Sequence, residues 1–507
     1  MSTAESREPA DPEVRTVTGA VRGHWEGGLA VFRGIPFAAP PVGEARFAAP
    51  RPVRGWDGVR EALHFGPPPP QDVAGFGDWA QPAEFAVGDD WLTVNVWTPD
   101  RDPAARRPVM VWIHGGAYKF GFSGVYDAGR ISRDGDVMVI TFNYRVGIEG
   151  FARIGGAPAN RGLLDQVAAL RWVRENITAF GGDRDQVTVF GESAGAGSVA
   201  ALLAMPSAAG LFRRAVVQSM PGVFFSDGLA RDIAGAIAAE VGLRPTVADL
   251  SGVDPQKLPA AGESLAATMS RYSGRWGQSA YAGRVFAPVV DGEVLPTTPW
   301  QALADGAGRG VQLIAGHNRD EFRLFLALGG QLGTIGDEQA TQALRVFAPG
   351  AEGERAYREA FPDASAERLY ELVRSDWTYR MPTLHLAEAQ VVGGGRVHVY
   401  ELTWSAPAGG GVLGACHGLD VWLLFGLPNP MTLGSALSAE AQTLGARFRA
   451  AWTAFAATGD PGWPTYDPRR RLTQLLDTDP AVIAYPEVSS RRIWRHHRFQ
   501  ALPLPAA

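Results

Sequence analysis

A strand, a tight turn and a helix around Ser193 constrain the fold of this chain more than any other feature. The turn Gly-Glu-Ser-Ala-Gly-Ala-Gly-Ser, residues 191–198, follows the strand-like run 187–190 and leads into the helix-like run 199–205. Gly191 and Gly195 allow such a turn to pass close to a neighbouring chain segment. A G-x-S-x-G turn in this context projects the serine hydroxyl from the top of a sheet. The alternative is a glycine-rich turn whose serine only caps the helix.

The rest of the pattern favours one large α/β domain. The chain has 507 residues, of which 46% are apolar, and no linker interrupts it. We expect residues 1–13, a polar stretch with prolines, to be disordered and residues 14–507 to form a single domain. Five strand-like runs alternate with helix-like segments, which predicts a large, mostly parallel central sheet with helices on both faces. These runs are 109–113, 137–142, 187–190, 311–315 and 397–402.

Three further segments have a predicted place in this fold. Apolar residues repeat at helical spacing over 163–180, which indicates a crossover helix between two strands. Residues 225–290 read as helices and loops inserted over the carboxyl edge of the sheet. Residues 66–88, rich in Pro and Gly with Phe76, Trp79 and Phe85, read as a surface loop near the site or an ordinary loop with aromatic anchors.

Charge and cysteine content limit the partners. The formal net charge is -6, without a basic cluster suited to nucleic acid or to a membrane surface. The N-terminus lacks the apolar core of a signal peptide, so we expect a cytoplasmic protein. Cys416 is the single cysteine, which excludes an intramolecular disulfide and a multi-cysteine zinc site. We expect no metal or cofactor, and the sequence leaves the oligomeric state open, a monomer included.

A serine nucleophile needs a base, an acid that orients the base, and donors for an oxyanion. The run 114–118, His-Gly-Gly-Ala-Tyr, follows a predicted strand and offers the backbone N–H groups of Gly116 and Ala117. The N–H of Ala194, directly after the serine, makes a third donor. The alternative is that this Gly-Gly pair forms only a tight turn.

The acid and the base should follow later strands, in the order serine, acid, histidine. The loop after strand 311–315 offers Asp320 and Glu321, and the late loop 414–420 offers His417. His114 and His317 also lie beside candidate loops and stay possible bases from the pattern alone. His496 and His497 belong to a basic stretch, 491–498, that reads as solvated surface.

The sequence also resembles the type-B carboxylesterases, a family that includes para-nitrobenzyl esterases and cholinesterases. The similarity covers nearly the whole chain in ordered motifs, at 32–43, 92–97, 143–147, 160–166, 180–183, 190–196, 288–292, 320–321 and 417–418. It implies an α/β-hydrolase fold with helical and loop insertions over the active site. It also implies a catalytic triad of Ser193, Glu321 and His417.

The resemblance further implies a supporting set of residues. Ser219 and Asp420 would lie behind the catalytic histidine and fix its ring. Buried ion pairs would join Arg33 to Asp89 and Arg145 to Asp165. Pro69 and Trp91 stand at or near the positions of a disulfide that many relatives have, so residues 69–91 should be more mobile.

The reaction that this set implies is hydrolysis of small to medium acyl or aryl esters through an acyl-enzyme. We expect His417 to lose its proton with an apparent pKa of about 6 to 7. A lactonase, a carbamate hydrolase or an amidase could use the same residues, and a non-catalytic interaction protein on this fold is the alternative from another class. Cys416 should be a buried packing residue and not the nucleophile.

Overall fold

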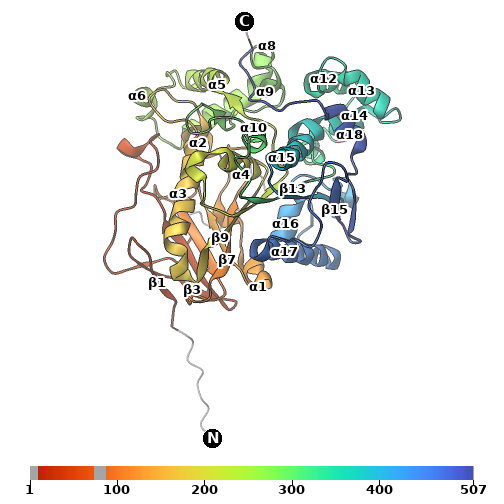
Figure 1. Cartoon of the computed structure of the whole chain (residues 1–507). Helices are drawn as coiled ribbons and strands as arrows, with labels where there is room; N and C mark the ends of the chain where they lie inside the picture. The colour runs from red at the N-terminus through yellow and green to blue at the C-terminus, as the bar shows by residue number, and fades with distance from the viewer. Residues whose placement is uncertain (1–9, 73–86, 506–507) are drawn as a thin grey trace.

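The computed structural model describes residues 10–72 and 87–505, which are built around an 11-stranded sheet (Figure 1). From one edge to the other, the strands are β16 (Ala481–Ala484), β15 (Leu472–Leu476), β14 (Val397–Leu402), β13 (Gln312–Asn318), β10 (Arg214–Gln218), β9 (Gly182–Glu192), β7 (Arg107–Ile113), β8 (Met138–Phe142), β6 (Thr93–Thr98), β4 (Leu29–Pro36) and β3 (His24–Glu26). A small separate sheet holds β1 (Glu13–Arg15), β2 (Ala20–Arg22) and β5 (Val59–Glu61).

The centre of the large sheet is parallel and its margins are antiparallel. Strands β8, β7, β9, β10, β13, β14 and β15 pair in parallel in that order. The pairs β15–β16, β8–β6, β6–β4 and β4–β3 are antiparallel. The five strands predicted from the sequence are all present, as β7, β8, β9, β13 and β14, and the mostly parallel sheet is confirmed.

Helices cover both faces of this sheet (Figure 1). One layer contains α3 (Arg161–Asn176), α4 (Ala194–Ala204), α10 (Pro299–Ala304) and α15 (Met381–Val392). The other contains α1 (Gly129–Gly135), α16 (Leu419–Phe425) and α17 (Ala439–Thr458). Successive residues of β7 alternate between the two layers, because side chains of a strand point to opposite faces. Val109 and Val111 pack in the first core, and Met110 and Trp112 pack in the second.

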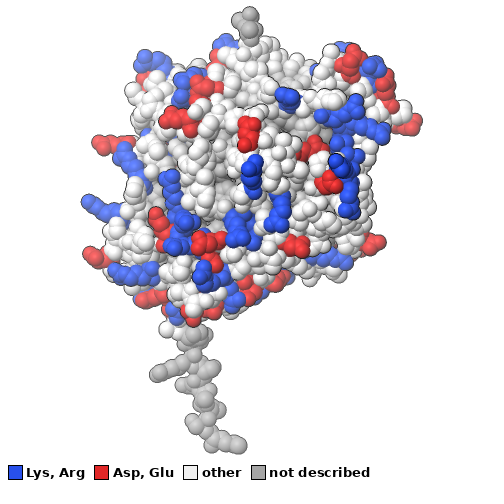
Figure 2. All heavy atoms as spheres, viewed as in Figure 1, with Lys and Arg blue, Asp and Glu red and all other residues white. Residues whose placement is uncertain are grey.

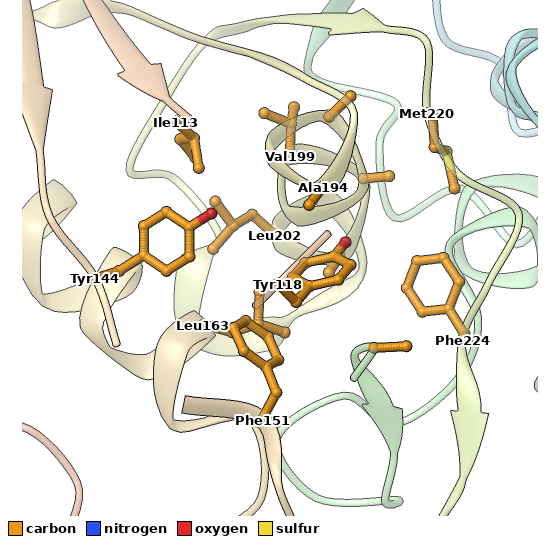
Figure 3. Packing of buried hydrophobic residues seen from close by; sticks show 14 of the residues in the cluster. Ile113, Tyr118, Tyr144, Phe151, Leu163, Ala194, Val199, Leu202, Met220 and Phe224 are labelled. Carbon is orange, nitrogen blue, oxygen red and sulfur yellow. The ribbon is translucent and has the colours of Figure 1, made fainter. Parts of the chain in front are cut away.

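The first core holds the helix that follows Ser193. Figure 3 shows Val199 and Leu202 of α4 within a cluster of buried side chains that also contains the aromatic rings of Tyr118 and Phe151. The rings of Tyr118 and Phe151 have centroids 4.7 Å apart. Every residue of α4 is buried, so the helix and the turn before it are fixed by packing on several sides.

The predicted crossover helix is α3, continued by the 3-10 helix η4 (Ile177–Phe180). The region 225–290 forms the insertion that the sequence predicts, with α5 (Asp227–Glu240), α6 (Val247–Leu250), α7 (Leu258–Thr268), η6 (Met269–Tyr272), α8 (Ser273–Trp276) and α9 (Gln278–Tyr281) between the paired strands β11 (Phe225–Ser226) and β12 (Val289–Val290). Phe76, Trp79 and Phe85 of the predicted surface loop lie outside the described residues.

Other short elements connect these parts. They are η1 (Gly43–Ala45), η3 (Ser123–Val125), α2 (Gly147–Phe151), η5 (Pro206–Ala208), α11 (Arg323–Leu328), α12 (Asp337–Phe347), α13 (Gly353–Ala360), α14 (Ala366–Ser375), the π-helix η7 (Asp376–Arg380), η8 (Ala408–Gly411) and α18 (Val488–Trp494). The π-helical turn η7 is an unusual element, and such turns are frequent at functional sites.

One of the two predicted ion pairs is present. Arg145 and Asp165 are fully buried and 2.7 Å apart. The prediction for Arg33 was wrong in its partner, because its guanidinium lies 2.7 Å from Glu26 and Asp89 is exposed. The short hairpin β3–β4 brings Glu26 to Arg33, a contact that the motif does not reveal.

The surface carries charges of both signs. Figure 2 shows Lys and Arg interspersed with Asp and Glu over the visible face. Among the described residues, no helix is both long enough and apolar enough to cross a membrane.

Candidate active site

Ser193 lies at the turn between β9 and α4, in a strained backbone conformation. Its φ of 54° and ψ of -124° are rare for a residue with a side chain. A Cβ at Gly195 would lie 2.0 Å from the carbonyl oxygen of Ile113, and one at Gly191 would lie 2.7 Å from the backbone of Gly195. Both glycines are therefore required by the close approach of backbone segments, as the sequence predicts.

Four adjacent parallel strands end in one row and carry the candidate residues. Ile113 of β7 is in register with Gly191 of β9, and Gln218 of β10 is in register with Glu192 of β9 and Gly316 of β13. The residues that follow these strands are the glycine turn after Ile113, then Ser193, Ser219 and the acidic loop. The site thus lies at the carboxyl edge of the sheet, where open parallel sheets bind ligands.

Glu321 and His417, separated by 96 residues, are joined by a short hydrogen bond. Nδ1 of His417 lies 2.6 Å from Oε2 of Glu321, and both side chains are buried. The other carboxylate oxygen, Oε1, accepts hydrogen bonds from the hydroxyl of Ser219 at 2.5 Å and the backbone N–H of Asn318 at 2.9 Å. Glu321 is therefore held by three donors, which fixes its orientation toward the imidazole.

The other ring nitrogen of His417 contacts a second carboxyl group. Nε2 lies 3.0 Å from Oε1 of Glu192, the residue directly before the serine. Burial raises the pKa of Glu192 to about 8. Burial disfavours the imidazolium, but Tyr379 and the two carboxyl groups outweigh it and raise the pKa of His417 to about 10. The pKa of His417 is thus higher than the value of about 6 to 7 that we expect from the sequence.

Ser193 and His417 line one cavity of about 460 Å³. In the described part of the chain, the Ser193 hydroxyl has no hydrogen-bond partner, and Nε2 of His417 faces Glu192. Catalytic hydrogen bonds are often loose before substrate binds, so this geometry is compatible with proton transfer between the two side chains. The remaining lining is mostly apolar and includes Phe122, Phe325 and Trp422.

The glycine turn approaches Ser193 from β7. Gly116 has a φ of 111° and Ala117 a φ of 55°, and both residues line the cavity. Ala194, the first residue of α4, lines a narrow recess behind Ser193. Within the described ranges, the N–H groups of these three residues donate to no other protein group. They are therefore available to a substrate oxygen.

The two carboxylates of the acidic loop have different surroundings. Asp320 accepts a hydrogen bond from the backbone N–H of Ala415 and lies 3.3 Å from Arg368 and 3.6 Å from Arg323. Through the contact with Ala415, Asp320 stabilises the loop before His417, and it does not contact the imidazole. Only Glu321, among the two candidates, is hydrogen bonded to the histidine.

The supporting residues named from the resemblance act differently from the prediction. Ser219 contacts the acid Glu321 and not the imidazole. Asp420 accepts hydrogen bonds from Gln218 at 2.8 Å and Tyr400 at 3.0 Å. The side chain of Asp420 is shorter than that of a glutamate, and these partners enclose its carboxyl group. It therefore links residues of two strands and makes no contact with the histidine.

The competing candidates lie apart from Ser193. His114 stacks on Tyr144 with ring centroids 4.3 Å apart, and burial lowers its pKa to about 4. His317 lies 3.1 Å from the Tyr485 hydroxyl, and burial lowers its pKa to about 3. Cys416 is buried in the second core, and burial raises its pKa. None of the three lines the cavity.

Three residues of the site were missed by the sequence analysis. Glu192 lies inside the turn motif and could have been identified from its place beside the serine. Tyr379, on the π-helix η7, stacks on His417 with centroids 4.1 Å apart. Arg284, after α9, also lines the cavity. No local pattern distinguishes these last two. Among the described residues, no group of three or more His, Cys, Asp or Glu could hold a metal ion.

Comparison with known proteins shows the family and the fold of the chain. Residues 10–486 match the carboxylesterase family. A para-nitrobenzyl esterase of Bacillus subtilis is 34% identical, covering 94% of this chain and 97% of that protein. Human carboxylesterase 3 is 33% identical, and the match covers 99% of this chain and 93% of that protein. The crystal structure of a Geobacillus stearothermophilus carboxylesterase matches with a TM-score of 0.82 and 36% identity. The match covers 95% of this chain and 99% of that one.

The fold is therefore that of the α/β-hydrolases, with its site at the carboxyl edge of the sheet. The chain belongs to the carboxylesterase family, and family and relatives together indicate a carboxylic ester hydrolase.

Proposed function

We propose that this chain hydrolyses carboxylic esters through an acyl-enzyme on Ser193, with His417 as general base and acid and Glu321 as the orienting acid. The observation that carries this proposal is the 2.6 Å hydrogen bond from His417 to Glu321 in the cavity that also holds the strained serine. Resemblance in sequence and a shared fold add to this argument but do not replace it.

In the first step, Ser193 attacks the ester carbonyl while Nε2 of His417 takes its proton. Glu321 stabilises the imidazolium, and the N–H groups of Gly116, Ala117 and Ala194 stabilise the oxyanion. His417 then protonates the leaving alcohol. In the second step, a water molecule activated by the same imidazole hydrolyses the acyl-enzyme. No cofactor takes part in these steps.

The substrates that fit are small to medium acyl or aryl esters. The leaving-group side of the cavity, around His417, is lined by Val421, Trp422 and Phe325, which suit an apolar or aromatic alcohol. The name para-nitrobenzyl esterase of one relative is compatible with an aromatic alcohol portion. A cytoplasmic location stays a prediction from the sequence.

Labelling with an organophosphate, followed by peptide mapping, tests the nucleophile. We expect one label per chain, on Ser193, and loss of ester hydrolysis in proportion to labelling. Ser193→Ala should lower turnover of p-nitrophenyl butyrate about 10⁶-fold, because triad members act as a unit. A label elsewhere, or a folded alanine variant with a tenth of the wild-type rate, would reject the mechanism.

A further inference from the structure

Arg284 places a positive charge beside the candidate nucleophile. It lines both the 460 Å³ cavity and the adjoining narrow recess, and Ala117, Ser193 and Tyr379 are the other residues common to both. The guanidinium therefore lies where the cavity and the recess meet. Arg284 is partly exposed as a whole, but a charged side chain beside a largely apolar cavity is unusual, since charge is better solvated by water than by apolar groups.

Arg284 has few partners of its own. Its Nη2 donates to the Tyr379 hydroxyl at 3.3 Å, while its Nε is buried without a hydrogen-bond partner in the described part of the chain. It forms no ion pair with any described carboxylate. Some buried arginines elsewhere have carboxylate partners, as Arg145 does in Asp165 and Arg46 in Glu149, whereas Arg161 donates to backbone carbonyls. Arg284 is thus left with an unpaired Nε and lies beside the site.

The surroundings do not neutralise this charge. Another cation of this region, Arg374, stacks over the rings of Phe322 and Phe347, donates to the Tyr281 carbonyl, and also lacks a carboxylate partner among residues 10–72 and 87–505. Burial, with a smaller contribution from Arg284, lowers the pKa of Arg374 to about 10. Glu192 is the one carboxyl group among the residues lining the cavity, and it faces His417.

The geometry shows which half of an ester meets Arg284. When the carbonyl oxygen faces the N–H groups of the glycine turn, the leaving oxygen must lie near His417 to be protonated. The acyl substituent then takes the remaining direction within the cavity, toward the mouth of the recess, which His417 does not line and whose volume of about 10 Å³ is too small to hold the chain itself. Val223, Phe286 and Ala287 form apolar walls there, and Arg284 is the charged residue among them.

We propose that Arg284 selects esters whose short acyl group ends in a carboxylate, that is, monoesters of small dicarboxylic acids. This inference rests on the proposed ester hydrolysis at Ser193. The planar guanidinium, with Nε free, would donate charge-assisted hydrogen bonds to the distal carboxylate. Because the small recess closes off this side of the 460 Å³ cavity, a short acyl chain brings the carboxylate within reach of Arg284 when the ester carbon is at Ser193.

A pair of substrates of equal size tests the proposal on the purified full chain. One is the mono-p-nitrophenyl ester of glutaric acid, and the other is the same ester with a terminal primary amide in place of the carboxylate. We expect a higher kcat/KM for the carboxylate in the wild type. Arg284→Met should lower the ratio of the two values about 10- to 100-fold, the effect of losing a hydrogen bond to a charged group. Arg284→Lys should retain part of the preference.

Arg271→Gln is the matched control, because Arg271 is exposed in the same insertion and does not line the cavity. It removes one positive charge and should leave the ratio unchanged. Hydrolysis of the amide-ended ester without preference for the carboxylate in the wild type would overturn the inference, as would an unchanged ratio in Arg284→Met. If the methionine variant does not fold, the wild-type and lysine ratios decide. Hydrolysis of neither ester would reject the proposed function as well.

Discussion

Glu192 Oε1 lies 3.0 Å from Nε2 of His417, the nitrogen that accepts the proton of Ser193 in the proposed mechanism. The imidazole is thus held between two carboxyl groups, since Nδ1 contacts Glu321 on the other side. In the proposed mechanism Glu321 orients the ring, whereas Oε1 of Glu192 lies against Nε2 at ion-pair distance and forms no hydrogen bond in the described part of the chain. The arrangement stabilises the imidazolium that forms during catalysis, but it also favours the protonated ring before substrate binds.

The pH dependence of hydrolysis should therefore lie on the alkaline side. His417 is a base only after losing its proton, and its pKa is raised to about 10. We expect kcat/KM for p-nitrophenyl butyrate to rise with pH, with an apparent pKa above the model histidine value of about 6.5. Glu192→Gln should lower that apparent pKa, because it removes one negative charge beside the ring. An unshifted pH profile in a folded variant would contradict this role.

Ser219→Ala should lower kcat about tenfold. The hydroxyl donates at 2.5 Å to Glu321, and its loss leaves one fewer donor on the buried carboxylate, an effect of about 1–3 kcal/mol. Ser198→Ala is the control, because Ser198 is equally buried but accepts its hydrogen bond from Gln166. Steady-state kinetics on both variants, with unfolding curves, separate the two effects. Equal losses of kcat would show that the contact only supports the fold.

The two acidic residues of one loop should differ in effect. Glu321→Gln should reduce turnover by about four orders of magnitude, as in comparable triads where the acid fixes the tautomer and stabilises the imidazolium. Asp320→Asn should cost far less, because Asp320 contacts the Ala415 backbone and two arginines. Turnover of one aryl ester by both variants is the measurement. The reverse order would show that the acid is misassigned.

The sequence was most informative where function requires a local backbone shape. Gly191 and Gly195 occupy the turn because a Cβ at either position would collide with backbone atoms. The turn can therefore be recognised from its glycines in the sequence. The parallel strands were also predictable, because strands buried on both faces are continuous apolar runs. Strand β10 was missed, because the polar residues Arg214 and Gln218 at its ends leave only three apolar residues between them.

Side-chain partners brought together from distant segments could not be predicted in this way. Arg33 pairs with Glu26, and Asp420 contacts Gln218 and Tyr400, because strand register decides which side chains meet. In the sequence, nothing distinguishes Arg284 from a surface arginine in a loop that follows a short helix. Its significance arises only from the folded chain, which places it beside Ser193 without a carboxylate partner in the described residues.

The ion pair between Arg145 and Asp165 should contribute more to the stability of the fold than an exposed ion pair does. Both side chains are fully buried, and three hydrogen bonds from Arg145 reach the two carboxylate oxygens. Asp165→Asn leaves a buried guanidinium without a counter-charge, so we expect a loss of about 3–5 kcal/mol in the free energy of unfolding. Urea denaturation followed by tryptophan fluorescence measures it.

Asp185→Asn is the matched comparison for this stability prediction. Asp185 pairs with Arg174 at 3.9 Å on the surface, where solvent screens the attraction. Its unfolding curve should coincide with that of the wild type, because exposed pairs contribute little. If Asp165→Asn unfolded at the same urea concentration as Asp185→Asn, the buried pair would not hold the Arg145 loop. The desolvated charge would then be compensated by its hydrogen bonds to backbone carbonyls, such as that of Ala48 at 2.8 Å.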